Sequence, residues 1–91
     1  MTPREYITAL AESFPCIRHL VPKPWDVQKF MAPINVVSTG ERHAMLFVAS
    51  VWNPGYAAEE GWRFDAIDAL TSWDSANRAA FIAWAQKPYL P

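Results

Sequence analysis

Apolar residues recur at intervals of three and four along most of the chain, which is the spacing of an amphipathic helix. The first such pattern spans residues 3–14, begins after Thr2 and is stopped by Pro15. Thr2 supplies a capping hydroxyl, Pro3 suits a first helical turn, and Glu5 completes a capping box. The sequence therefore predicts a helix over residues 3–14. A proline-containing, ordered connector over residues 15–25, with a short turn near residues 17–20, is expected to follow.

Aspartates precede the next helical patterns. Asp26 is expected to cap a pattern that Pro33 interrupts, which predicts a kink or two short helices ending at Gly40. Asp65 is expected to cap a helix whose inner face holds Ile67, Leu70 and Trp73. Asp74 is expected to cap the last helix, which turns Ala80, Phe81 and Trp84 inward and ends at Pro88. Residues 53–63, which contain Pro54, Gly55 and Gly61, are expected to form a loop, and residues 89–91 a tail.

Residues 41–52 allow two interpretations. The capping-box sequence from Ser38 to Glu41 and the stop signal at residues 53–55 favour a buried helix. The run from Leu46 to Trp52 also suits a buried strand, because both of its alternating faces are apolar. In that case it would pair with residues 34–38 through a turn at residues 39–40. The length between the two signals favours the helix.

These elements predict an all-α fold, a compact single domain of about five short helices over residues 1–91. The alternative is an α+β fold with a small hairpin at residues 34–52. Composition agrees with a folded domain, because 52% of the residues are hydrophobic and 19% are charged. The net charge of −1 argues against nucleic acid as a partner.

Two features of the sequence bear on the cellular compartment of the protein. A single cysteine excludes an internal disulfide and suits a reducing cytoplasm. The first residues lack the apolar run of a signal peptide, and the longest mostly apolar stretch, residues 44–52, is half the length of a membrane span. A cytoplasmic protein without membrane association is expected.

Few residues suggest chemistry. Cys16, His19 and His43 are the available thiol and imidazoles, and they allow a metal site or a nucleophile pair as alternatives. A structural zinc site needs a fourth ligand, and no third orienting group accompanies a cysteine–histidine pair. The acidic residues that precede helices are explained by capping. The sequence therefore predicts no enzyme activity, no metal and no cofactor.

The tryptophans divide into two groups. Trp52, Trp73 and Trp84 lie within apolar patterns and are expected in the core. The remaining two adjoin loop residues, and exposed Trp and Tyr side chains often carry the binding energy of protein interfaces. The predicted partner-binding residues are Trp25, Tyr56, Trp62 and Tyr89.

The stretch from residue 42 to residue 77 resembles a pattern in small uncharacterised proteins of bacterial phages and mobile elements. The matching features are Arg42, the apolar segment ending in Trp52-Asn53, Phe64-Asp65 and Trp73-Asp74. The resemblance implies a helix over residues 41–52 and a mobile-element origin. It implies no activity.

The expected function is a small cytoplasmic protein-interaction module that binds another protein or a second copy of itself. One concrete form is a phage or mobile-element inhibitor of a host protein, such as an anti-CRISPR or anti-defence factor. Two alternatives remain open: a DNA-binding helical regulator, and an enzyme or metal site that uses Cys16, His19 or His43.

Overall fold

The computed structural model describes residues 1–89, and within them the chain is helical and contains no strand. The elements are α1 (Pro3–Glu12), the 3-10 turn η1 (Arg18–Leu20), α2 (Val27–Met31), α3 (Thr39–Trp52), α4 (Pro54–Glu59), α5 (Ala66–Ser72) and α6 (Ser75–Gln86). The all-α prediction is confirmed. Among residues 1–89, no helix combines the length and the apolar character that a bilayer crossing requires.

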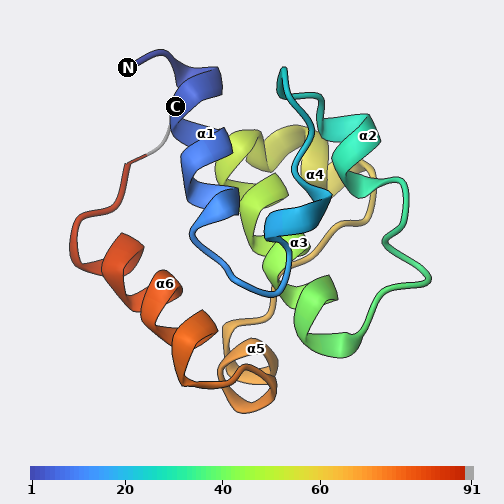
Figure 1. Ribbon diagram of the computed structural model, residues 1–91. Helices are drawn as coiled ribbons and strands as arrows, with labels where there is room; N and C mark the ends of the chain where they lie inside the picture. The colour runs from blue at the N-terminus through green and yellow to red at the C-terminus, as the bar shows by residue number, and fades with distance from the viewer. Residues whose placement is uncertain (90–91) are drawn as a thin grey trace.

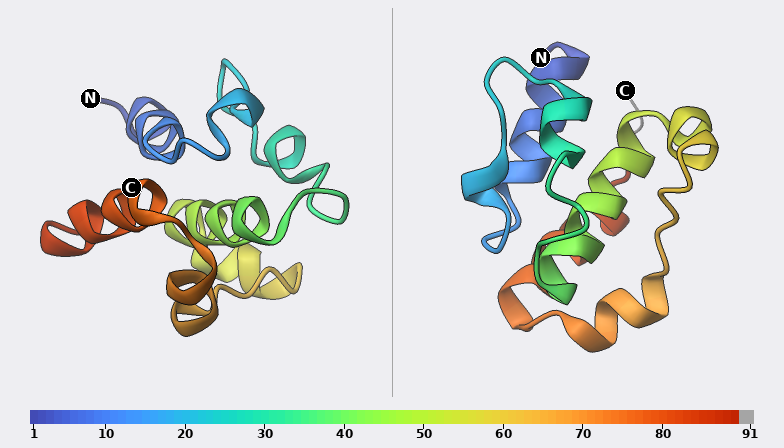
Figure 2. Two further views of the ribbon diagram at one scale, coloured as in Figure 1. Left: turned by 60° about the horizontal axis from the view of Figure 1, so that its bottom comes forward. Right: turned by 90° about the vertical axis from the view of Figure 1, so that its right-hand side faces the viewer.

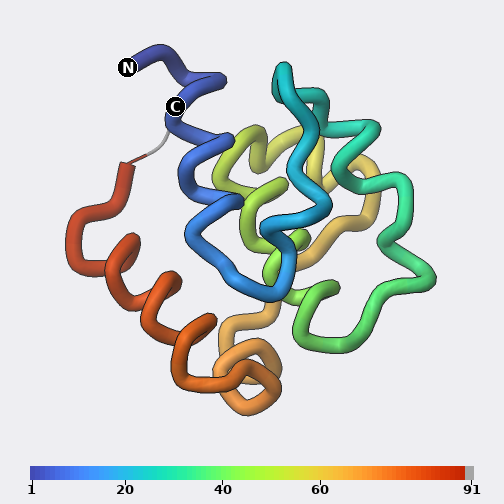
Figure 3. The backbone as a smooth tube through the Cα atoms, viewed as in Figure 1, coloured from blue at the N-terminus to red at the C-terminus, as the bar shows by residue number. Residues whose placement is uncertain are grey.

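Helix α3 lies at the centre of the molecule (Figure 1) and contacts α1, α2, α4 and α5. In both views of Figure 2, α1 and α2 lie on one side of α3, and α4 and α5 lie on the other. Helix α6 then leads the chain back toward α1 (Figure 3), where the ring centroids of Tyr6 and Tyr89 are 4.5 Å apart. The helices therefore share one core built around α3.

Helix α3 is buried nearly all round, as expected of a helix with apolar residues on every face. Its buried residues are Ala44, Met45, Leu46, Phe47, Val48, Ala49 and Val51. The half-buried Ser50 donates its hydroxyl hydrogen to the carbonyl of Leu46 at 2.8 Å, so this polar group is satisfied within the helix. The helical interpretation of residues 41–52 is confirmed, and the hairpin alternative is wrong.

The predicted caps are present. Each capping side chain accepts a hydrogen bond from a backbone N–H two or three residues further on, which satisfies one of the unpaired donors of the first turn. These caps are Thr2, Asp26, Ser38, Asp65 and Asp74. Thr2 and Ser38 also form full capping boxes with Glu5 and Glu41. Helix starts were therefore set by residues within one turn of each other.

Two predictions are wrong: the second short helix ending at Gly40 and the continuous loop over residues 53–63. Residues 32–37 form turns in place of a second short helix ending at Gly40, because Pro33 lacks the N–H that would continue α2. Residues 53–63 are not a continuous loop, because α4 occupies their first half. Asn53 accepts a hydrogen bond from the N–H of Tyr56 at 3.0 Å, and Pro54 fills the first helical position. The same Asn-Pro pair that ends α3 thus begins α4.

The core contains residues that the sequence placed elsewhere. Trp25, predicted at the surface, is buried with 6% of its surface exposed, and its ring packs against those of Phe30 and Trp52. Ile67, predicted to face inward, is 77% exposed, because the short α5 buries Ala69 in its place. Trp73 is buried as expected. Trp52, Trp84 and Phe81 are half-buried and pack against the core. Residues 90 and 91 of the predicted tail lie outside the described residues.

Candidate functional site

Two of the four predicted partner-binding residues meet in space. Tyr56 lies in the first turn of α4, and Trp62 follows that helix. Their ring centroids are 5.6 Å apart and the ring planes are nearly perpendicular, at 89°. Both side chains are half-buried. Tyr89 lies against Tyr6 of α1, and Trp25 is buried apart from the Tyr56–Trp62 pair, with 6% of its surface exposed.

The turn after α4 brings the two rings together. Gly61 adopts a positive φ of 76°, a backbone conformation that glycine accommodates without strain. The N–H of Gly61 donates to the carbonyl of Ala58 at 3.1 Å, and that of Trp62 donates to the carbonyl of Ala57 at 2.8 Å. These bonds reverse the chain at the helix end, so the Trp62 ring returns to the side of α4 that carries Tyr56.

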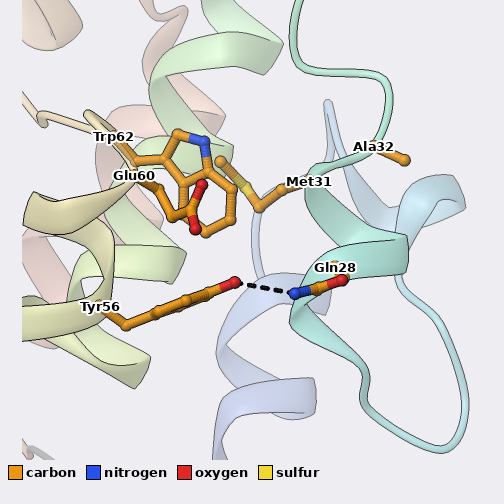
Figure 4. Close-up of a pocket in the computed structure, with 6 residues that line it drawn as sticks. All are labelled: Gln28, Met31, Ala32, Tyr56, Glu60 and Trp62. Atoms are coloured by element: carbon orange, nitrogen blue, oxygen red, sulfur yellow. Dashed lines mark hydrogen bonds between the residues drawn. The ribbon is translucent and has the colours of Figure 1, made fainter.

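A pocket of about 230 Å³ opens beside these rings, between α2 and α4. It is lined by Gln28, Met31, Ala32, Tyr56, Glu60 and Trp62, and is called the α2–α4 pocket below. Figure 4 shows Gln28 and Tyr56 pointing toward each other across it, and the Gln28 amide donates to the Tyr56 hydroxyl oxygen at 2.8 Å. This bond fixes the Tyr56 ring against α2.

A second hollow of about 500 Å³ lies against α4 and shares Trp62 with the first. Its lining residues are Ser50, Pro54, Ala57, Ala58, Trp62, Arg63 and Phe64. The Trp62 side chain therefore forms a wall common to two neighbouring depressions. An aromatic side chain in that position offers surface to an occupant of either one.

Sequence reasoning missed Gln28, Met31 and Glu60 as members of this site. Gln28 and Tyr56 are 28 residues apart, and no pattern in the chain relates them. The helix that carries Tyr56 did have a sequence signal in Asn53-Pro54, a capping residue followed by a first-turn proline.

The thiol at residue 16 is not activated. Burial, together with the negative charge of Glu41, raises the pKa of Cys16 to about 11. A reactive cysteine needs a lowered pKa, since the thiolate is the nucleophile. The Cys16 sulfur lies 3.9 Å from the carbonyl oxygen of Gly40, its weak hydrogen-bond acceptor. This environment does not favour the nucleophile alternative.

The two histidines lie in different settings. The Nε2 atom of His19 is 3.6 Å from a carboxylate oxygen of Glu41, at an exposed position. The Nδ1 atom of His43 is buried and has no hydrogen-bond partner within the described chain. In residues 1–89, no three His, Cys, Asp or Glu side chains are grouped as a metal site requires.

Three basic side chains of the first half contact groups of their own chain. The Arg18 guanidinium donates to the carbonyl of Glu12 at 3.0 Å, and the Arg42 guanidinium donates to the carbonyl of Ile34 at 3.3 Å. Lys23 pairs with the Glu12 carboxylate at 2.9 Å. Each of these contacts joins a basic side chain to another segment of the same chain.

Comparisons of this chain with protein-family models, with curated proteins and with solved structures each found no match. The resemblance to proteins of phages and mobile elements therefore stays a prediction, and the site must be interpreted from its own geometry.

Proposed function

We propose that this protein is a small protein-interaction module and that the α2–α4 pocket, with the adjoining hollow, is its contact surface. The observation that carries the proposal is the pairing of Tyr56 with Trp62 at the edge of an open pocket. Half-buried aromatic side chains that line a pocket are the usual anchors of protein interfaces. One form of this proposal is a phage or mobile-element inhibitor of a host protein.

The proposed surface has the construction of a protein interface. Exposed polar side chains, Gln28 and Glu60, surround the aromatic pair, which matches an apolar centre with a polar rim. The hydrogen bond between Gln28 and Tyr56 holds the ring in place before binding and lowers the ordering cost of association.

Site-specific photo-crosslinking tests the proposal. A photoreactive benzoylphenylalanine is placed at Ala32, an exposed residue that lines the pocket, and a matched one at exposed Ile67 on α5, in cells that express the protein. We expect protein adducts at position 32 that are absent at position 67. Adducts of the same proteins at both positions, or at neither, would contradict the proposal.

A second substitution links the adducts to the aromatic pair. Trp62→Ala removes the wall shared by the two depressions and should abolish the adducts at position 32. Because Trp62 packs against the core, the fold of the variant is checked by circular dichroism. Gln28→Arg, which places a bulky charge in the pocket from an exposed position, provides an independent variant with little effect on folding. Adducts to the protein itself would identify a second copy as the partner, and light scattering would then measure the mass of the assembly.

A further inference from the structure

The lining of the α2–α4 pocket joins aromatic ring faces to a carboxylate. The perpendicular rings of Tyr56 and Trp62 form two of its sides, and Glu60, the residue that ends α4, lies at the same pocket (Figure 4). Of the six lining residues, Glu60 alone carries a charge. The carboxylate of Glu60 is in neither of the ion pairs found within residues 1–89.

A cation is the ligand that this combination favours. The face of an aromatic ring attracts a positive charge within about 6 Å of its centroid, and Trp and Tyr are more effective than Phe. The carboxylate of Glu60 adds direct attraction, whereas it would repel an acidic ligand. No lysine or arginine of residues 1–89 lines the pocket, so the chain does not supply this cation itself.

From this charge complementarity, we infer that the α2–α4 pocket receives the cationic end of a lysine or arginine side chain of the protein partner. The inference rests on the proposed function of the pocket as a contact surface. A volume of about 230 Å³ accommodates the end of one such side chain and not a folded element. Gln28 contributes by fixing the Tyr56 ring through the 2.8 Å hydrogen bond to its hydroxyl oxygen.

Titrations followed by ¹H–¹⁵N NMR test the ligand class. The probes are N-acetyl-arginine amide and N-acetyl-lysine amide, with N-acetyl-citrulline amide as the neutral counterpart of arginine. The reporter is the indole N–H signal of Trp62, assigned with Trp62→Phe. We expect a saturable shift with both cationic probes, and binding of citrulline that is weaker by on the order of fivefold. Equal binding of citrulline, or no saturable shift at about 50 mM probe, would overturn the inference.

A charge-removing variant with a matched control tests the part assigned to Glu60. Glu60→Gln should weaken binding of the cationic probes about two- to fivefold. Glu59→Gln removes the neighbouring charge, which does not line the pocket, and should leave binding unchanged. Both positions are exposed, so both variants are expected to fold. Equal weakening by the two variants would show a general field effect and refute a role for Glu60 in the site.

The two proposals fail in different ways. Adducts at position 32 that persist while all cationic probes fail would retain the contact surface and refute the cationic anchor. Cationic probes that bind to a protein whose position 32 captures no partner would identify a site for a free ammonium or guanidinium compound. That result would overturn a partner side chain as the occupant.

Discussion

Asn77 joins α6 to the segment that follows α1, and replacing it should lower the stability of the protein. It is the buried residue of α6, with 5% of its surface exposed. Its side-chain oxygen accepts from the N–H of Cys16 at 3.2 Å, 61 residues away in sequence. Its amide nitrogen donates to the carboxylate of Asp74 at 2.8 Å, and the same carboxylate oxygen accepts its backbone N–H at 3.0 Å.

Asn77→Ala leaves the half-buried N–H of Cys16 without its acceptor. An unsatisfied buried donor costs about 1–3 kcal/mol, against a total stability of about 5–14 kcal/mol for a domain of this length. The melting temperature should fall by roughly 4–8 °C for each kcal/mol. Urea unfolding followed by circular dichroism measures the change. A loss below about 0.5 kcal/mol would refute the assignment of Asn77 as the link between α6 and the segment after α1.

Asn77→Asp keeps a side-chain oxygen that can accept a hydrogen bond but removes the amide group that donates one. The new carboxylate can still accept from Cys16, but it faces the carboxylate oxygen of Asp74 where an amide hydrogen was donated. Repulsion between the two carboxylates raises the pKa of the pair in the folded state, so protonation favours folding. The deficit relative to the wild type should therefore be largest at pH 7 and shrink as the pH falls toward 4.5. A deficit that does not change with pH would contradict this geometry.

Three further predictions concern the core, the thiol and the caps. Phe47→Ala should destabilise the protein by about 3–5 kcal/mol in urea melts, because Phe47 is 3% exposed and packs among four rings. The centroid of its ring lies 5.0–5.7 Å from the ring centroids of Phe14, Phe64, Phe81 and Trp84. A loss under about 1 kcal/mol would place Phe47 outside the core. Iodoacetamide at pH 7.5 should modify native Cys16 far more slowly than the urea-unfolded chain, since burial raises its pKa to about 11, and equal rates would contradict that environment. Hydrogen bonds from the backbone N–H groups of Thr2, Ser38 and Asn77 lower the pKa values of Glu5, Glu41 and Asp74, respectively, below their ordinary values of 4.5, 4.5 and 3.8. The stability that these carboxylates contribute is present above their ordinary pKa values and is lost as the pH falls through the lowered ones. The urea midpoint should therefore drop between pH 5 and pH 2, and it should drop less in each of the variants Glu5→Gln, Glu41→Gln and Asp74→Asn.

The starts of the capped helices and the presence of α1 and α3 could be predicted from the amino-acid sequence alone. A cap forms between a side chain and a backbone N–H two or three residues away, so the pairing of Ser38 with Glu41 is visible in the sequence. The apolar run of residues 44–51 likewise requires a buried element, and caps at both ends made it a helix. Where one residue served two purposes the prediction failed: Asn53 ends α3 and begins α4, and local patterns do not separate those roles.

Contacts between distant segments were decided by packing. The bond between Gln28 and Tyr56 spans 28 residues and that between Cys16 and Asn77 spans 61, and both depend on how helices settle around α3. Trp25 follows Pro24 in a connector that suggested a surface position, yet it is buried because Phe30 and Trp52 pack against its ring in the folded chain. Burial and long-range hydrogen bonds are properties of the assembled core, since the free energy of each depends on neighbours that no local stretch contains. The α2–α4 pocket therefore arises only in the tertiary structure, because Gln28 and Met31 of α2 complete a lining that α4 and its following turn begin.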